Sequence, residues 1–358
     1  MMKQLIHRIS TRLRTMFMTT QVQNTSNQDF VNFCFQTILG REPNEKAAVA
    51  YVNALDSKRL TREKILIQFL LSEEFKTKTK NKEYFPAGHY YSAIPSLEDR
   101  EAFLAQPPSR QDILGINLNA EKQFELLRQF KDYYEEYPFQ DTKSGNLRYY
   151  YINPSYSYTD ALTLYSMLRT FKPRRIIEIG SGYSSGAMLD TAELFLEDKI
   201  DFTFIEPYPD LLHSLIKERD KKHTILPVRL QDVDKDIFKS LEVNDILFID
   251  STHVSKLGSD VNRIFFEILP TLQPGVLIHF HDIFWPFEYP SDWVKKGFAW
   301  NEAYVLRAFL EFNDSFEILF FASFLHTHHH AWFQENMPLW LKNSGGNIWM
   351  RRRKTDAQ

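Results

Sequence analysis

The chain has 358 residues, enough for two domains, and its 43% apolar and 25% charged residues are typical of soluble globular proteins. A net charge of −3 gives no sign of a nucleic-acid partner. The single cysteine, Cys34, excludes an intrachain disulfide framework and predicts a reducing, cytoplasmic compartment. No apolar run approaches the roughly 20 residues of a transmembrane span.

The N-terminal segment combines basic and apolar residues. Over residues 3–18 the apolar side chains recur at helical spacing between Lys3, Arg8, Arg12 and Arg14. This pattern fits either a weak membrane-surface helix or a frayed or docked helix, and it lacks the apolar core of a signal peptide. A polar stretch follows, so residues 1–28 are predicted to be a tail and linker.

A small helical module is predicted over residues 29–80. Apolar residues repeat at helical spacing from Phe30, and Asp29 lies near the start of this first helix. Gly40 is suited to end it, and Thr61 is suited to cap a third helix.

This stretch resembles a helical module of unknown function from bacterial proteins linked to surface polysaccharides and glycosyl transfer. The resemblance covers residues 29–76 and is carried by Phe30-Val31, Leu39–Pro43 and Leu71–Phe75. It implies a context of polysaccharide biosynthesis and no chemistry.

The pattern of the chain changes from residue 174. Residues 81–149 are predicted to be a connector with helices, after which short apolar runs alternate with helical segments. Such alternation is typical of a parallel, doubly wound α/β sheet, here placed in residues 150–358. The predicted strands are 175–179, 201–206, 224–228, 245–250, 275–281, 315–321 and 347–352.

A glycine turn follows the first of these strands. Gly180, Gly182 and Gly186 allow a sharp turn and the close approach of a ligand, and Ser181 lies inside the turn. Their G-x-G-x-x-x-G spacing differs from the dinucleotide pattern G-x-G-x-x-G. The preceding Glu178 suits a cationic amino-acid ligand better than a pyrophosphate, which it would repel.

Two further acids follow the next strands. Glu206 ends the second strand, where an acid can hold both hydroxyls of a ribose. Asp232 follows the third strand and can accept a hydrogen bond from an adenine amino group.

Together these motifs resemble the cofactor site of class I S-adenosylmethionine-dependent methyltransferases, over about residues 150–356. The resemblance implies a seven-stranded Rossmann-like sheet that ends in a hairpin of 316–321 with 346–351. It also implies S-adenosylmethionine as the cofactor. The implied cofactor-binding residues are Glu178, Gly180, Ser181, Gly182, Glu206 and Asp232.

The ends of the fourth and fifth strands carry the candidate chemistry for the acceptor. Asp250, His253, His281 and Asp282 are expected to converge, because these strand ends open into one crevice. Three uses stay open at this point: His253 or His281 as a general base, a divalent metal at Asp250 and Asp282, or orientation of a sugar or other polyol.

This half resembles metal-dependent natural-product and sugar O-methyltransferases, in which acids at these two strand ends bind magnesium. Asp250 and Asp282 match those positions, whereas Ile283 stands where catechol-type enzymes carry a third ligand, Asn. His281 can substitute, but histidine is a poor magnesium ligand, so metal dependence stays open.

Three neighbouring features have structural interpretations. The aromatic segment 284–293, continued by 300–304, is either a substrate lid or a packed loop. His279 is expected to point away from the site, because side chains alternate along a strand. The histidine-rich tract 326–330 is predicted to be a loop.

We predict a bacterial, cytoplasmic methyltransferase that acts on an oxygen of a sugar, glycan precursor or other polar small molecule. A second hypothesis is a non-catalytic scaffold that keeps the fold and recruits partners through the helical module. A third, an NAD-dependent oxidoreductase, is disfavoured by the glycine spacing and by Glu178. Neither the acceptor nor the oligomeric state follows from the sequence.

Overall fold

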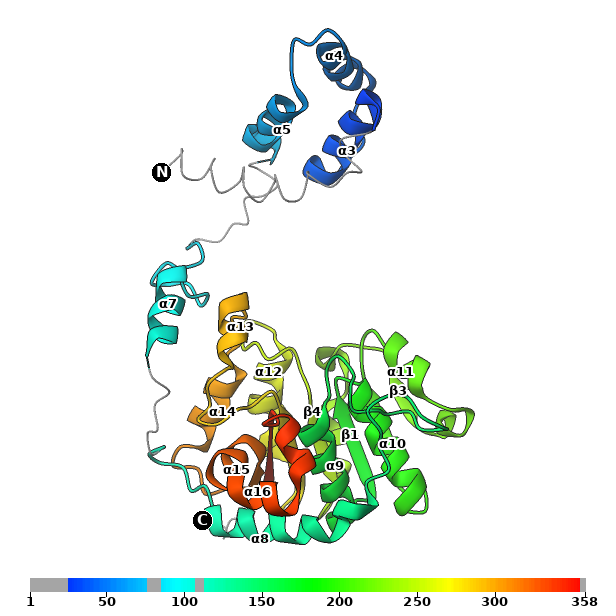
Figure 1. Cartoon of the computed structure of the whole chain (residues 1–358), viewed down its shortest axis with the longest axis vertical. Helices are drawn as coiled ribbons and strands as arrows, with labels where there is room; N and C mark the ends of the chain where they lie inside the picture. Colours follow the sequence, from blue (N-terminus) through cyan, green and yellow to red (C-terminus); the bar gives the residue numbers. More distant parts are fainter. Residues whose placement is uncertain (1–24, 76–84, 107–112, 355–358) are drawn as a thin grey trace. The chain divides into compact units, whose positions relative to one another are not determined.

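The computed structural model describes residues 25–75, 85–106 and 113–354. The chain divides into two compact units, Met1–Ser92 and Ala93–Gln358 (Figure 1). No helix among the described residues is long and apolar enough to cross a membrane. The N-terminal helix predicted over residues 3–18, either at a membrane surface or frayed or docked, lies outside the described residues.

The first unit contains a module of three helices: α3 (Asn27–Leu39), α4 (Glu45–Asp56) and α5 (Arg62–Leu71). Ser26 caps α3 by accepting a hydrogen bond from the backbone N–H of Asp29, so the helix begins slightly earlier than expected. As predicted, Gly40 ends α3 in the left-handed conformation and Thr61 caps α5.

An ion pair links two of the segments that carry the resemblance of this module. Arg41 donates to both carboxylate oxygens of Glu74, at 2.6 and 2.8 Å, and its guanidinium lies 4.9 Å from the centroid of the Phe35 ring. The turn after α3 is thereby fastened to the end of the module. The buried core comprises Phe30, Val31, Cys34, Phe35, Leu39, Leu55, Ile65 and Phe69.

The second unit is built around one seven-stranded sheet in the described part of the chain, with the order β3-β2-β1-β4-β5-β7-β6. Strands β1 to β5 run parallel, and β7 is antiparallel to both β5 and β6. The strands are β1 (Arg175–Ile179), β2 (Asp201–Ile205), β3 (Thr224–Leu226), β4 (Ile246–Ile249), β5 (Leu277–His281), β6 (Phe316–Phe321) and β7 (Asn347–Arg352).

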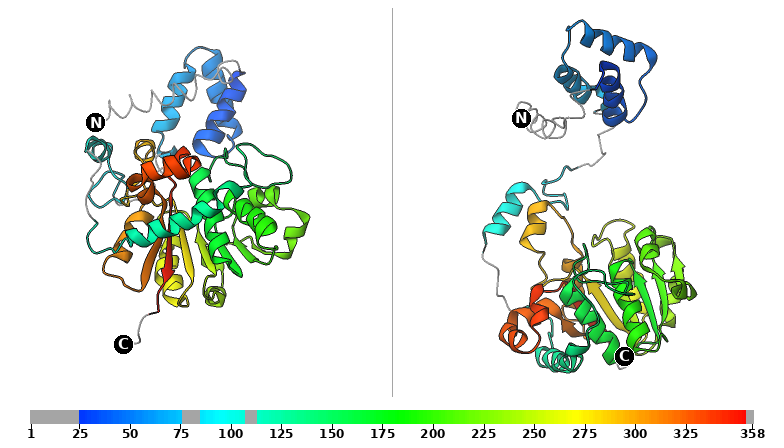
Figure 2. Two further views of the ribbon diagram at one scale, coloured as in Figure 1. Left: turned by 60° about the horizontal axis from the view of Figure 1, so that its bottom comes forward. Right: turned by 45° about the vertical axis from the view of Figure 1, so that its right-hand side comes forward.

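The predicted doubly wound fold is confirmed, including the C-terminal hairpin. Helices pack on the faces of the sheet (Figure 2), and chain order reverses between β1 and β4, which places a crevice beyond their carboxyl ends. The central strand β4 is a continuous apolar run, and β1 is apolar except at Arg175 and Glu178, because both faces of these strands are buried. The α-helices described in this unit are α7 (Leu97–Ala105), α8 (Ala120–Phe130), α9 (Tyr158–Phe171), α10 (Tyr183–Phe195), α11 (Asp210–Leu215), α12 (Asp260–Arg263), α13 (Ser291–Lys296), α14 (Glu302–Leu310), α15 (Ala322–His328) and α16 (His330–Asn336).

Short helices of other types complete the unit. One described segment, η5 (Ile264–Ile268), is a π-helix. The 3-10 helices are η1 (Lys131–Glu136), η2 (Glu218–Lys222), η3 (Leu230–Asp232), η4 (Lys235–Ser240), η6 (Leu269–Thr271) and η7 (Pro338–Lys342).

The second unit extends N-terminally beyond the predicted domain start at residue 150. Leu127 and Phe130 of α8 are buried in the same core as the sheet, because α8 covers β6. In the tract 326–330, the first three residues end α15 and His330 begins α16, with only His329 between them, so the prediction of a loop there was wrong. Buried Phe324 and Phe333 anchor these two helices on the protein.

A buried arginine fixes the segment that leads into α9. Arg148 is 2% exposed and makes a bidentate ion pair with Asp220, at 2.7 and 2.8 Å. It also pairs with Asp190 and Glu193 of α10, at 2.7 Å each, and the backbone N–H groups of Arg148 and Tyr149 donate to Asp190. The segment is thus bound to both α10 and η2.

We predict that Arg148→Ala lowers the free energy of unfolding by about 3–5 kcal/mol, because Asp190 and Asp220 would stay buried without a counter-charge. Urea denaturation of the full chain measures this difference. Lys239→Ala removes an exposed ion pair with Asp236 and should cost less than about 1 kcal/mol. Equal losses in the two variants would contradict the prediction.

Candidate active site

The turn between β1 and α10 requires glycine at position 180. Gly180 has a φ of 80°, and a Cβ atom there would lie 1.8 Å from the carbonyl oxygen of Asp250. The N–H of Asp250 donates to the carbonyl of Ile179 at 2.8 Å. The ends of β1 and β4 therefore touch through their backbones, which places the glycine turn against Asp250.

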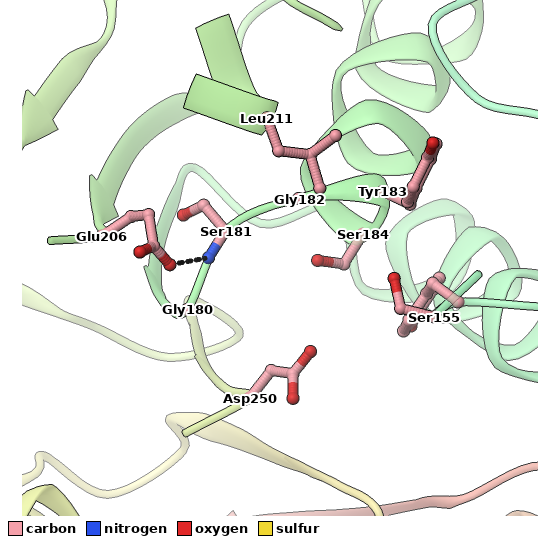
Figure 3. A pocket seen from close by; sticks show the side chains of 10 residues that line it. Ser155, Gly180, Ser181, Gly182, Tyr183, Ser184, Glu206, Leu211 and Asp250 are labelled. Carbon is pink, nitrogen blue, oxygen red and sulfur yellow. Dashed lines mark hydrogen bonds between the residues drawn. The ribbon is translucent and has the colours of Figure 1, made fainter. Parts of the chain in front are cut away.

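A pocket opens at this point, beyond the carboxyl ends of β1, β2 and β4 (Figure 3). Glu206, directly after β2, accepts hydrogen bonds from the N–H groups of Ser181, at 3.1 Å, and Tyr208, at 2.8 Å. Asp250 borders the pocket from β4, with 29% of its side chain exposed. The lining residues are Ser155, Tyr156, Gly180, Ser181, Gly182, Tyr183, Ser184, Glu206, Leu211 and Asp250.

Glu178 does not line this pocket. It is fully buried, and its two oxygens accept hydrogen bonds from Ser184 Oγ, at 2.6 Å, and from Ser185 Oγ. Burial raises the pKa of Glu178 to about 8, against the opposing effect of these two hydroxyls. Glu178 therefore reaches the pocket only through Ser184, at the first turn of α10.

Asp232 is also absent from the pocket lining. It is exposed and forms an ion pair at 3.0 Å with Arg229, three residues earlier. The structure thus brings Gly180, Ser181, Gly182 and Glu206 to the pocket and leaves Glu178 and Asp232 outside it.

The ends of β4 and β5 form a second cluster, here called the Asp-His-Asp centre, made of Asp250, His253 and Asp282. One ligand atom from each residue lies within 4.8 Å of the others. His253 Nε2 is 3.4 Å from Asp250 Oδ1 and 3.4 Å from Asp282 Oδ2. The expected convergence of these three side chains is present in the structure.

Two residues of this centre have the left-handed backbone conformation, with a φ of 59° at His253 and 56° at Asp282. Such a conformation costs a non-glycine residue about 1–3 kcal/mol and needs support from its surroundings. At His253 the support is visible, because the N–H groups of Asn301 and Glu302 both donate to its carbonyl at 3.1 Å.

Glu302 is a residue of this site that the sequence did not reveal. It is fully buried at the start of α14, with its Oε2 at 2.8 Å from His253 Nδ1. Ser251 Oγ donates to its other oxygen at 3.0 Å, and the Trp300 ring lies 4.4 Å from the His253 ring. The available signal was an acid inside the aromatic segment that follows β5.

Charge strongly affects protonation in the centre. Burial alone lowers the pKa of His253, but hydrogen bonds to Asp250 and Glu302 and the charge of Asp282 outweigh it and raise the pKa to about 10. Burial raises the pKa of Asp282 to about 6, against the charges of the nearby histidines. The surrounding carboxylates therefore favour the protonated, imidazolium form of His253.

His281 and His279 lie deeper, on a shared face of β5. The His281 ring packs 5.1 Å from that of Tyr156, with its Nε2 at 3.5 Å from Asp282 Oδ1. The His279 ring lies 5.9 Å from the His281 ring, since residues two apart on a strand face the same way. Neither ring lines the pocket, so His279 lies away from it as expected, although it shares a face of β5 with His281.

We predict that Gly180→Ala lowers the free energy of unfolding by more than positive φ alone would cost. The strain of positive φ costs about 1–2 kcal/mol, and the overlap with the Asp250 carbonyl adds roughly 1–3 kcal/mol or more. Gly145 also has a positive φ but has open space at its Cβ position, so Gly145→Ala is the matched control with only the first cost. Urea denaturation compares the two, and similar losses would contradict the prediction.

We predict that Glu178 makes stability depend on pH. The folded protein holds the carboxyl proton up to about pH 8, whereas the unfolded chain releases it near pH 4.5. The folded state therefore binds more protons between these values, and the free energy of unfolding falls as pH rises, by at most about 1.4 kcal/mol per pH unit. Glu178→Gln should remove this component. Parallel pH profiles of denaturation for the variant and the wild-type chain would contradict the assignment.

Two family models match the sequence. Residues 177–283 match a model described as a methyltransferase domain, and residues 13–79 match a domain of unknown function, DUF4214. The second match confirms the resemblance of the helical module.

Similar proteins were found by sequence and by structure. An uncharacterized protein from Archaeoglobus fulgidus is 36% identical over 169 residues, which cover 45% of this chain and 76% of that protein. The O-methyltransferase TomG from Streptomyces achromogenes, solved with S-adenosylmethionine, is 13% identical, with coverage of 72% and 96% of the two chains and a TM-score of 0.34. An apo-structure of CmcI-N160 is 15% identical, with coverage of 56% and 73% and a TM-score of 0.37.

The sequence matches carry the assignment, because the structural likenesses are remote. The chain belongs to the S-adenosylmethionine-dependent methyltransferases, in one family with the archaeal protein.

Proposed function

We propose that the chain transfers the methyl group of S-adenosylmethionine to a hydroxyl oxygen of a sugar, glycan precursor or similar polar molecule. The observation that carries this proposal is the position of Asp250, which belongs to both the pocket and the Asp-His-Asp centre. Donor and acceptor sites that share one carboxylate place the methyl group next to the receiving oxygen.

The pocket provides the donor half. Gly180 and Gly182 allow the cofactor to approach the backbone closely, and Glu206 is placed to accept hydrogen bonds from ribose hydroxyls. Glu178 acts as a positioning residue through Ser184. The negative charges of Glu206 and Asp250 also favour a cationic sulfonium ligand.

The Asp-His-Asp centre provides the acceptor half, and its residues fit a divalent cation. Neighbouring ligands of an ion coordinated at roughly 2.0–2.1 Å lie about 3.0–3.4 Å apart, and the two His253 separations of 3.4 Å agree with this. The carboxylate on the other ring nitrogen is also typical of metal-binding histidines. A cation held there would lower the pKa of an acceptor hydroxyl.

The reaction needs mainly positioning from the protein. The acceptor oxygen attacks the methyl carbon in line, a C–O bond forms, the C–S bond breaks, and S-adenosylhomocysteine and a proton are released. Alignment of two reactants in a bound complex lowers the activation free energy of a reaction by up to about 7–11 kcal/mol. Asp250 borders both reactants and is the residue best placed to maintain that alignment.

Two features support a sugar or glycan acceptor. The Trp300 ring adjoins that of His253, and the Phe298 ring adjoins that of Trp300. Both rings remain at least partly exposed, which suits stacking on the apolar face of a sugar ring. The helical module resembles modules of polysaccharide-related proteins.

We predict that Glu206→Ala weakens S-adenosylmethionine binding about 100-fold in calorimetry, because two hydrogen bonds to a charged group are lost. Asp250→Asn should keep the affinity for S-adenosylmethionine within roughly tenfold and abolish methyl transfer. A non-catalytic scaffold would show no methyl transfer even in the wild-type chain. Glu242→Ala, an exposed acid near Arg175, is the control for Glu206.

The acceptor is tested with labelled S-adenosylmethionine on a panel of sugar nucleotides, glycans and phenols, with mass spectrometry of the products. Transfer to phenols alone would contradict the sugar class. The proposed function would be overturned if the intact chain did not bind S-adenosylmethionine and Glu206→Ala did not change the affinity for it.

A further inference from the structure

Both ring nitrogens of His253 have carboxylates beside them, and these carboxylates come from different parts of the fold. Nδ1 donates to Glu302 at 2.8 Å, whereas Nε2 faces Asp250 and Asp282 at 3.4 Å each. The first distance is a direct hydrogen bond. The other two are longer than an ordinary N–H···O hydrogen bond and agree with the spacing between two neighbouring ligands of one cation.

Glu302 is itself held in place. Its side chain is fully buried, and its second oxygen accepts a hydrogen bond from Ser251 Oγ at 3.0 Å. The backbone N–H of Glu302 donates to the carbonyl of His253, and Trp300 packs against the imidazole. The ring of His253 is therefore fixed in orientation by the segment that begins α14.

An imidazole ligand discriminates between cations. Mg²⁺ prefers oxygen ligands and retains several waters, whereas Mn²⁺, Co²⁺ and Zn²⁺ accept a neutral imidazole nitrogen more readily. A carboxylate on the far nitrogen fixes the tautomer and makes the near nitrogen a stronger donor to a metal. Two carboxylates and one such imidazole are thus a mixed donor set.

We propose that Glu302 is a positioning residue that presents His253 Nε2 to the Asp-His-Asp centre, so that this centre binds Mn²⁺ or Co²⁺ more tightly than Mg²⁺. The inference rests on the proposed function, since it concerns the cation of that site. Beyond the proposed function, the inference assigns a role to Glu302, which lies 49 positions from His253 in the chain, and a preference of the site among metals.

The preference is measured by calorimetry of the full chain, freed of metal, with Mn²⁺, Co²⁺ and Mg²⁺ chlorides. We expect Co²⁺ and Mn²⁺ to bind at least about tenfold more tightly than Mg²⁺. His253→Ala should reduce that preference, because only the two carboxylates remain. Equal affinities for the three ions in the wild-type chain overturn the proposal.

The role of Glu302 is measured with Glu302→Ala. We expect Co²⁺ affinity to fall by about 10- to 100-fold and the visible absorption of the bound Co²⁺ to change, because the imidazole is no longer held. Affinity for S-adenosylmethionine should stay within about twofold. Glu311→Gln, an acid paired with Arg307 at the other end of α14, should leave every one of these quantities unchanged.

Glu302→Gln separates positioning from folding. The amide keeps the volume of the side chain and can still accept from Nδ1–H, so it should recover part of the lost Co²⁺ affinity. Circular dichroism checks that each variant is folded. If Glu302→Ala does not fold, the Co²⁺ affinity of Glu302→Gln tests the role of Glu302 instead. Wild-type Co²⁺ affinity and absorption in the folded variants overturn the role of Glu302. Such a result leaves cofactor binding and methyl transfer intact, so it is distinct from a failure of the proposed function.

Discussion

The site depends on one close backbone approach, in which the carbonyl of Asp250 occupies the space where a side chain at position 180 would begin. Only glycine permits this contact, and the contact joins the turn after β1 to the end of β4. Because Asp250 belongs to both the pocket and the Asp-His-Asp centre, the backbone contact also sets the distance between the pocket and the centre. Backbone atoms in adjacent strands are the least mobile reference that a fold offers.

A second constraint places the other wall of the pocket. Ser155 and Tyr156 line it, and they follow a segment that the buried Arg148 fastens to α10. Buried ion pairs are weak sources of net stability, because removing charges from water offsets most of their attraction. The specific gain is geometric: the same helix whose first turn borders the pocket also holds the segment that faces it.

The sequence predicted what is local. Buried parallel strands appear as apolar runs, and the glycine turn with Glu206 follows from strand-end motifs, so the sheet and most of the pocket lining could be foreseen. The partners of Glu178 and Asp232 could not be predicted from the sequence: serine hydroxyls donate to Glu178, and Arg229 forms an ion pair with Asp232. The partnership of Glu302 with His253 arises from tertiary packing of α14, and no spacing in the sequence encodes it.

The departures from local preference coincide with the centre. His253 and Asp282 have positive φ without being glycine, and Glu302 is an acid buried away from water. Each of these costs free energy, so each must be sustained by specific contacts. The segment from Trp300 to Glu302 supplies them at His253, through two N–H donors, one carboxylate and one aromatic ring. What looks in the sequence like a lid therefore also forms part of the wall that keeps the imidazole facing its two carboxylates.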